Sequence, residues 1–236
     1  MIHLERQGKL PAARPALGIL VASAGLPMAA WMAWCQTSFG DFTGSILKIQ
    51  FLGWTQKPFL EWFHHPLFTP KGFWIFLSEN LSTFWQGEFL WQRKPLAIPG
   101  VDRFYVLLTL ALLLVALIVR CRQRTPLSAP ERLAMDFGFA CLLAMFAFFA
   151  LLSVKYDFQD CFYPSRAHPF FTSGRLMLGL LIPFLVLFTF GLDRLLGKIG
   201  ENTKFIILAL LLLFMLGSEI TLDWKIFPNE YNWFHL

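Results

Sequence analysis

The stretch that decides the fold is His168–Leu196, HPFFTSGRLMLGLLIPFLVLFTFGLDRLL. A polar start, Thr172–Gly174, is followed by Arg175 and by an apolar run from Leu176 to Leu192. A run of about 20 apolar residues is long enough to cross a bilayer as a helix. We therefore predict a transmembrane helix whose first turn is capped by Thr172 or Ser173.

Arg175 lies at the start of this predicted helix and allows two interpretations. The first amide hydrogens of a helix carry partial positive charge, and an arginine beside them makes a site suited to phosphate. In the second interpretation, Arg175 extends to the membrane interface and anchors the helix. Both interpretations place the residue at a membrane surface.

The composition places the whole chain in a membrane. Of 236 residues, 56% are hydrophobic and only 15% are charged, whereas about 25% are charged in a soluble domain. The formal net charge of +5 comes from short basic clusters beside apolar runs, which are orientation signals and do not indicate nucleic-acid binding. We predict an all-α polytopic membrane protein that contacts lipid, with one membrane domain over 1–236.

Hydropathy predicts five spans, and the basic segments between them give the orientation. The expected spans are 16–34, 104–119, 133–154, 170–192 and 205–220. Basic residues precede the first span, follow the second and follow the fourth, so these segments are expected on the cytoplasmic side of a bacterial inner membrane. The N-terminus is then cytoplasmic and the C-terminus lies outside.

The first span carries small residues on one face. Gly25, Ala29 and Ala33 recur at intervals of four, which allows another helix to approach closely. This face is a candidate docking surface for a membrane protein partner.

The long outer segment, 36–103, is rich in aromatic residues. Pro58 suits the start of one short helix, and the spacing from Trp74 to Trp85 predicts a second. We expect two helices lying at the membrane interface, and the alternative is a re-entrant hairpin packed among the spans. Asn80-Leu81-Ser82 matches the glycosylation sequon, which often occurs by chance.

The outer loop 155–169 concentrates charge before the fourth span. Asp157, Asp160, Arg166 and His168 lie within a dozen residues. They suggest either a site for a polar headgroup or a network that fixes the loop. Elsewhere, Asp136 suits a helix N-terminus.

The remaining candidates for chemistry are few. His64-His65 is a weak candidate for metal binding, because adjacent side chains point apart on most backbones. The spacing of the four cysteines is not that of metal ligands. Cys35 and Cys161 are expected on the same side of the membrane, where we expect two unpaired thiols, and a disulfide between them is the alternative. We expect no metal and no cofactor.

One pattern resembles a known family. Thr83-Phe84-Trp85, then Phe89 and Trp91, then Pro95-Leu96 and Pro99 precede a span, and Gly174-Arg175 comes two spans later. This arrangement, over roughly Leu81–Leu192, resembles bacterial polytopic membrane proteins of unknown function that are related to the GT-C class of glycosyltransferases. In that family a tyrosine follows the glycine and arginine, and this chain has Leu176 there. Gly179 stands near an expected proline, and Pro183 comes late.

The resemblance implies the C-terminal half of a protein that uses a sugar carried on polyprenyl phosphate at the outer membrane face. It implies that Arg175, Gly174 and Ser173 hold the lipid phosphate with help from Arg166 and His168. Trp85, Trp91 and Phe84 would form a wall for the acceptor. The catalytic acid of the class lies in its first outer loop, where Asp41 is the candidate by position, and no catalytic residue is assigned.

Three hypotheses follow for the function. The chain is an enzyme, or part of one, that binds a polyprenyl-phosphate-linked sugar and supports its transfer in the cell envelope. Alternatively, it is a non-catalytic scaffold or partner subunit. A transporter is the last hypothesis, because the predicted spans carry few charges and those lie near their ends.

Overall fold

The structure is a computed structural model, and it describes residues 10–87, 90–91, 94–95, 97–122, 127–161, 163–197 and 199–224. It confirms an all-α polytopic membrane protein with almost no strand. The chain divides into two compact units. One unit holds Met1–Thr55 with Phe158–Cys161, and the other holds Gln56–Asp157 with Phe162–Leu236.

The first unit contains two helices, α2 (Leu10–Phe39) and α3 (Ile46–Phe51). α2 covers the whole of the first predicted span, although several of its side chains lie outside the described residues. The turn after α2 packs closely, because a Cβ at Gly44 would lie 3.1 Å from the Sγ of buried Cys35. Gly44 also has a φ of 65°, which glycine adopts without strain.

The second unit contains the remaining helices and the short strands. In chain order they are η1 (Phe59–His64), η2 (Pro66–Phe68), α4 (Pro70–Gln86), β2 (Leu90–Trp91), β3 (Lys94–Pro95), α5 (Pro99–Cys121), α6 (Ala129–Lys155), β4 (Tyr156–Asp157), η3 (Gly174–Leu180), α7 (Leu181–Leu195) and α8 (Glu201–Asp223). The η elements are 3-10 helices. β1 (Thr55–Gln56) lies where the two units meet in the chain, and β2 pairs antiparallel with β3.

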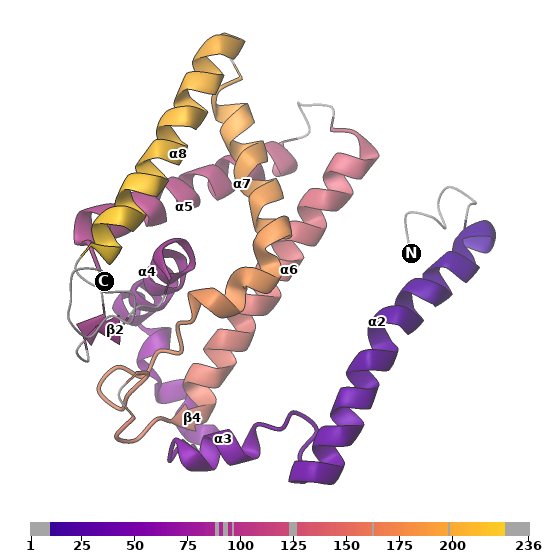
Figure 1. Cartoon of the computed structure of the whole chain (residues 1–236), viewed down its shortest axis with the longest axis vertical. Coiled ribbons are helices and arrows are strands. Elements are labelled where there is room, and N and C mark those ends of the chain that lie inside the picture. The colour runs from indigo at the N-terminus through magenta and orange to yellow at the C-terminus, as the bar shows by residue number, and fades with distance from the viewer. Residues whose placement is uncertain are drawn as a thin grey trace, which may run out of the picture. The chain divides into compact units, whose positions relative to one another are not determined.

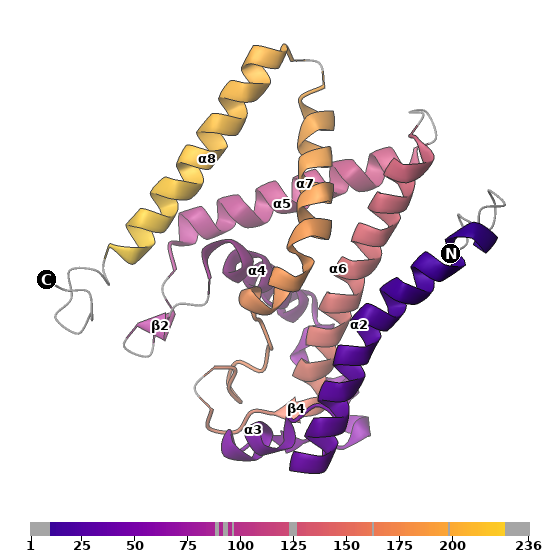
Figure 2. The same ribbon diagram turned by 45° about the vertical axis from the view of Figure 1, so that its right-hand side comes forward.

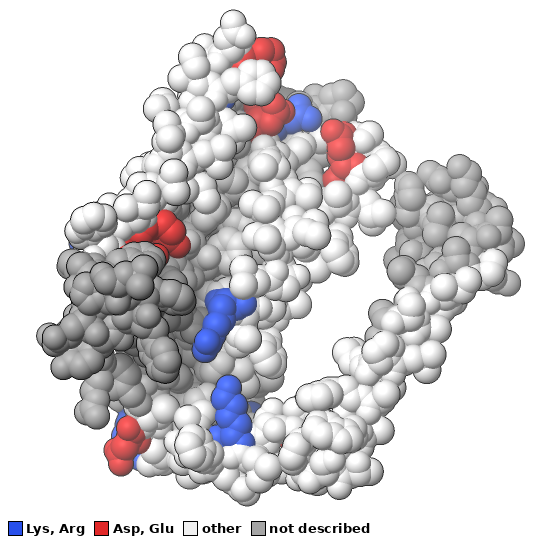
Figure 3. Space-filling view, in the orientation of Figure 1, with Lys and Arg blue, Asp and Glu red and all other residues white. Residues whose placement is uncertain are grey.

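Four helical segments of this unit are long and apolar enough to cross a membrane: Pro99–Cys121, Ala129–Lys155, Gly174–Leu195 and Glu201–Asp223. They overlap the second to fifth predicted spans. Charged side chains are also few on the face drawn in Figure 3. The first predicted span remains a prediction as a membrane crossing, and the C-terminal tail 225–236 lies outside the described residues.

Prolines and polar caps place the helix starts earlier than hydropathy does. α5 begins at Pro99, five residues before the predicted start, because proline is well suited to a first turn. α6 begins with a capping box in which Ser128 and Glu131 satisfy each other's backbone amides. Asp136 is therefore two turns inside α6. There it forms a bidentate ion pair with Arg120, whose guanidinium nitrogens lie 2.7 and 2.8 Å from the two carboxylate oxygens.

The fourth span differs from the single α-helix predicted. Its first seven residues form the 3-10 helix η3, and the α-helix α7 begins only at Leu181. Pro183 explains the change, since its ring would clash with the carbonyl of Gly179 in a continuous α-helix and it has no amide hydrogen to donate. The predicted cap is also wrong, because the side chain of Ser173 makes no capping hydrogen bond.

The core of the second unit lies where α5 and α6 meet α7, and α5 crosses α7 in both views (Figures 1 and 2). Gly191 of α7 sits against the backbone of Leu112 so closely that a Cβ there would overlap the Leu112 carbonyl. One turn earlier in α7, Leu187 packs onto Gly138 of α6. Small residues thus bring these backbones together, as expected for helices packed in a membrane.

α8 is the most exposed span, and its later half packs on the start of α5. The Tyr105 hydroxyl and the Ser218 hydroxyl are 2.7 Å apart, and the rings of Phe104 and Phe214 are 4.5 Å apart. Most of the large apolar side chains of α8 are exposed, which suits contact with lipid.

α4 packs among the spans along one of its faces. It contacts α5 and η3, and the Phe84 ring lies 4.6 Å from the Phe184 ring of α7. The opposite face exposes Phe73 and Trp74. This amphipathic arrangement combines features of the two alternatives for the outer segment, since one face of α4 is covered by spans and the other is open. Near Pro58 the predicted helix is present as the 3-10 helix η1.

Candidate functional site

The candidate site is built on α4 and on the loop that leads into η3. Gly174 lies directly against the backbone of α4 at Thr83 and Phe84, where any Cβ would overlap main-chain atoms. The amide of Ser173 donates to Oδ1 of Asn80, at 3.4 Å. Asn80 is fully buried and donates to the Phe76 carbonyl, so the sequon at Asn80 faces the protein interior.

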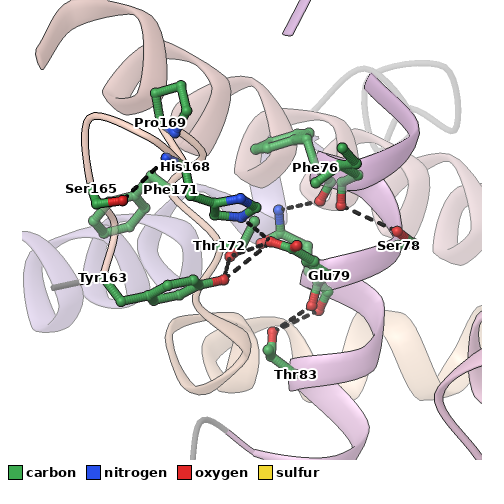
Figure 4. A network of polar contacts seen from close by, with 12 residues as sticks. Phe76, Ser78, Glu79, Thr83, Tyr163, Ser165, His168, Pro169, Phe171 and Thr172 are labelled. Atoms are coloured by element: carbon green, nitrogen blue, oxygen red, sulfur yellow. Dashed lines mark hydrogen bonds and ion pairs between the residues drawn. The ribbon is translucent and has the colours of Figure 1, made fainter. Parts of the chain in front are cut away.

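Glu79 is the centre of a network that joins α4 to this loop (Figure 4). Its Oε2 accepts a hydrogen bond from His168 Nε2 at 2.8 Å, and the Tyr163 and Thr172 hydroxyls lie 3.1 and 3.3 Å from it. These two hydroxyls are also hydrogen-bonded to each other, so one of them donates to the other and the second donates to Glu79. A carboxylate oxygen accepts hydrogen bonds, so Nε2 of His168 carries the hydrogen. The Tyr163 and His168 rings also stack, with centroids 5.6 Å apart. The network fixes both the loop and the direction of the Glu79 carboxylate.

Arg166 and Asp157 form an ion pair within the same loop. The Arg166 guanidinium donates to both carboxylate oxygens of Asp157, at 3.0 and 3.4 Å. With His168 bound to Glu79, two of the loop's predicted headgroup ligands are engaged with protein carboxylates. This geometry favours the alternative in which the charges fix the loop.

His65 anchors the end of the loop from another element. Its Nδ1 accepts the amide of Leu67 at 3.1 Å, which leaves Nε2 to donate to the Pro169 carbonyl at 3.0 Å. The side chain is only 4% exposed. Burial, with the charge of Lys57, lowers the pKa of His65 to about 4. His65 therefore holds the loop in its neutral form. His64 is exposed, and its Nδ1 lies 3.3 Å from the Leu60 carbonyl.

The residues predicted to hold phosphate are brought near α4 but have unequal access. Ser173 and Gly174 are buried, whereas Arg175 is exposed. Because η3 has only seven residues and the Ser173 amide is bound to Asn80, the anion site expected from the helix start is not formed by that amide. The phosphate role of Arg175 stays a prediction.

The residues predicted as an acceptor wall lie largely within the packing of α4. Trp85 donates from its indole to Thr109 at 2.8 Å and stacks on Tyr105 with a centroid distance of 5.4 Å. Phe84 and Trp85 both pack against the core around α7. Trp91 belongs to β2, and its side chain lies outside the described residues.

A groove opens between α4 and the start of α5, beside the Glu79 network. Its volume is about 420 Å³, within the range of about 300–1,000 Å³ typical of ligand sites. Its lining comprises Trp74, Ser78, Glu79, Ser82, Pro99, Asp102, Arg103, Val106 and Leu107. The groove thus brings two carboxylates, one guanidinium and two hydroxyls together with an aromatic ring, and Val106 and Leu107 add apolar side chains to its lining.

The other candidates from the sequence have local roles or remain isolated. The Asp41 carboxylate accepts from the Thr43 hydroxyl and from the amides of Ser45 and Ile46. These bonds lower the pKa of Asp41 and stabilise the turn before α3. All four cysteines are free thiols, and the described residues contain no cluster of three His, Cys, Asp or Glu side chains that could hold a metal ion.

Sequence reasoning missed the groove and its central carboxylate. No sequence pattern singles out Glu79, and Asp102 and Arg103 lie just outside the predicted span 104–119. The signal that was available is Pro99, which starts α5 early and places these two residues on its first turns. Nothing local to Glu79 indicates Tyr163 or His168 as its partners.

Comparisons with known proteins were made at the level of families, of sequences and of structures. No family model, no curated protein and no solved structure matches this chain.

Proposed function

We propose that this membrane protein binds the headgroup of a polyprenyl-phosphate-linked sugar at the outer face of the bacterial inner membrane, in the manner of a glycosyltransferase-like protein. The observation that carries the proposal is the groove between α4 and α5. It combines the groups that bind sugars, namely carboxylates, hydroxyls and an aromatic ring, with one cationic side chain for a phosphate.

The position of the groove suits a ligand with a polar head and an apolar tail. The lining of the groove includes Val106 and Leu107, which belong to the apolar part of α5. Leu107 and Leu114 lie on the same side of α5, seven residues apart, and are 60% and 55% exposed. An isoprenoid tail can follow this exposed face while the headgroup occupies the groove.

Arg103 is our first candidate for the phosphate, and Arg175 is the second. Arg103 lines the groove and is exposed, so its guanidinium can form paired hydrogen bonds with a phosphate. Arg175 does not line the groove, and its exposed position on η3 suits a ligand that extends beyond it. The proposal assigns no catalytic residue.

The proposal predicts the effect of removing the groove's cation. We expect Arg103→Ala to weaken binding of a polyprenyl-phosphate-linked hexose roughly tenfold or more, because a charge-assisted pair is lost. The measurement is a titration of the lipid against the protein in nanodiscs. Arg122→Ala is the matched control, since this exposed arginine lies at the other end of α5.

Three results would contradict parts of this proposal. If the native chain does not bind the lipid, the function is wrong. If Arg103→Ala and Arg122→Ala lose the same amount of lipid affinity, Arg103 does not bind the phosphate. Unchanged affinity of Arg175→Ala would likewise remove Arg175.

A second candidate function is that of a partner subunit. Within the unit that holds α2, a Cβ built at Gly25 would meet no atom within 4 Å, and Ala29 and Ala33 are exposed. The expected observation is a stoichiometric membrane partner that co-purifies with the native chain and is lost on Gly25→Leu. If the Gly25→Leu variant retains the partner, this face of α2 is not the docking surface.

A further inference from the structure

The Glu79 carboxylate is held so that one oxygen is used by the protein and the other is left for a ligand. The polar groups of Tyr163, His168 and Thr172 all lie within hydrogen-bond distance of Oε2. Within the part of the chain that the structure describes, Oε1 receives no hydrogen bond. The Glu79 side chain is 30% exposed and lines the groove. Oε1 is therefore an acceptor whose direction is fixed before any ligand arrives.

The charges of the groove select among ligand groups. Among the described residues of its lining, Glu79 and Asp102 supply two carboxylates and Arg103 supplies a cation. Carboxylates repel a phosphate but accept hydrogen bonds from hydroxyl groups. The exposed ring of Trp74 adds an aromatic face on the same groove, and such faces stack on the apolar sides of sugar rings.

We infer that Glu79 is a specificity-determining residue: its Oε1 accepts a hydrogen bond from a hydroxyl of an uncharged sugar ring, and the groove therefore distinguishes a sugar-bearing polyprenyl phosphate from the bare lipid phosphate. This inference rests on the proposed function and assigns the sugar to the carboxylate side of the groove. The phosphate then lies toward Arg103, away from Glu79.

Preorganisation makes the selection effective. The network that holds Glu79 comes from a different segment of the chain, so the carboxylate does not have to be ordered when the ligand binds. Tyr163, His168 and Thr172 are positioning residues in this arrangement. They do not line the groove, and they act by keeping Oε2 occupied and Oε1 directed outward.

The variant Glu79→Gln tests the inference sharply. A glutamine has one accepting oxygen, and the donors at the Oε2 position, His168 and one of the two hydroxyls, require it, so its NH₂ group would take the Oε1 position. The network would be kept while the group facing the ligand changes from acceptor to donor. Glu61→Gln is the matched control, because Glu61 is exposed on η1 and does not line the groove.

The experiment compares two lipids, a polyprenyl-phosphate-linked hexose and the same polyprenyl phosphate without sugar, each titrated against protein in nanodiscs. The native chain is expected to bind the hexose lipid more tightly than the bare lipid. Glu79→Gln is expected to weaken binding of the hexose lipid roughly tenfold or more while leaving the bare lipid unchanged or slightly tighter. Glu61→Gln should match the native chain with both lipids.

The outcomes separate this inference from the proposed function. If the native chain binds neither lipid, the proposed function fails and this inference fails with it. If the native chain binds both lipids equally, or if Glu79→Gln weakens both to the same extent, the role of Glu79 in sugar recognition is overturned while lipid binding stands. The comparison of the two lipids on the native chain needs no variant, so equal binding overturns the inference even if Glu79→Gln does not fold.

Tyr163→Phe is a second variant, and it tests the positioning of the Glu79 carboxylate without changing its charge. It removes one of the two hydroxyls at Oε2 and leaves the carboxylate in place. We expect a smaller loss of hexose-lipid affinity than that of Glu79→Gln, again without an effect on the bare lipid. A loss that is the same for both lipids would indicate a purely structural role for the network.

Discussion

The side chain of His65 fixes the outer loop through two hydrogen bonds that require the neutral ring. Nδ1 accepts from Leu67, so protonation would place a hydrogen where an amide hydrogen already lies. The ring also packs edge-on against Phe170, with centroids 5.9 Å apart. Burial lowers the pKa of His65 from the ordinary 6.5 to about 4. The unfolded chain therefore takes up a proton at a higher pH than the folded chain.

This difference predicts loss of stability in acid. Stability from His65 is fully present above pH 6.5 and decreases as the pH falls toward 4, by roughly 3 kcal/mol at most. His65→Asn removes the titrating ring and keeps an acceptor for Leu67, so its unfolding temperature should fall less between pH 7 and pH 4.5. Thermal unfolding in detergent measures this. His64→Asn, at the exposed neighbour, should keep the native pH dependence, and an identical fall for both variants would exclude His65 as the cause.

At the scale of elements, the contact between α4 and η3 fixes the position of the loop relative to the groove. The contact depends on the absence of a side chain at Gly174, which lies on the backbone of Thr83 and Phe84. Backbone atoms cannot move aside as the end of a flexible side chain can. Any larger residue therefore has to separate η3 from α4 and disturb the Glu79 network.

Gly174→Ala is accordingly expected to destabilise the protein by about 1–3 kcal/mol or more, as overpacking does. Gly179→Ala is the matched control in the same 3-10 helix, because a Cβ there would meet no atom within 4 Å. The measurement is the unfolding temperature of each variant in the same detergent. Equal unfolding temperatures for the two variants would show that the contact at Gly174 is not tight.

At the scale of the whole molecule, the alternation of spans assigns each connecting segment to one side of the membrane. α5 ends at Cys121, and α6 then crosses to the loop that contains Ala167. The basic residues after α5 predict a cytoplasmic position for that end, and the loop with Ala167 is then expected outside. The groove at the start of α5 lies on the same side as this loop.

The orientation predicts which cysteines react from outside. In chains whose other cysteines are replaced, the exposed Cys121 should react with a membrane-impermeant maleimide only after the membrane is opened. An exposed cysteine introduced by Ala167→Cys should react on intact spheroplasts. The reverse pattern would invert the topology and place the groove in the cytoplasm.

Local patterns were sufficient for some of the architecture. Four spans could be found because apolar length is a property of contiguous residues, as in Ala129–Lys155. The error in the fourth span was also local, since Pro183 was visible but its effect on the preceding seven residues was not recognised. The aromatic residues of α4 were placed on a helix correctly, but composition could not tell that Trp85 packs inward.

By itself, the sequence determined that this chain is an all-α membrane protein and where its later spans lie, because hydrophobicity acts over consecutive residues. Only the tertiary structure decided what those spans bring together. The partners of Glu79 lie 84 to 93 positions from it in the chain, and the groove needs α4 beside the first turns of α5. Such contacts depend on how helices cross, which is fixed by close backbone approaches at Gly174 and Gly191 and by the packing of many side chains at once.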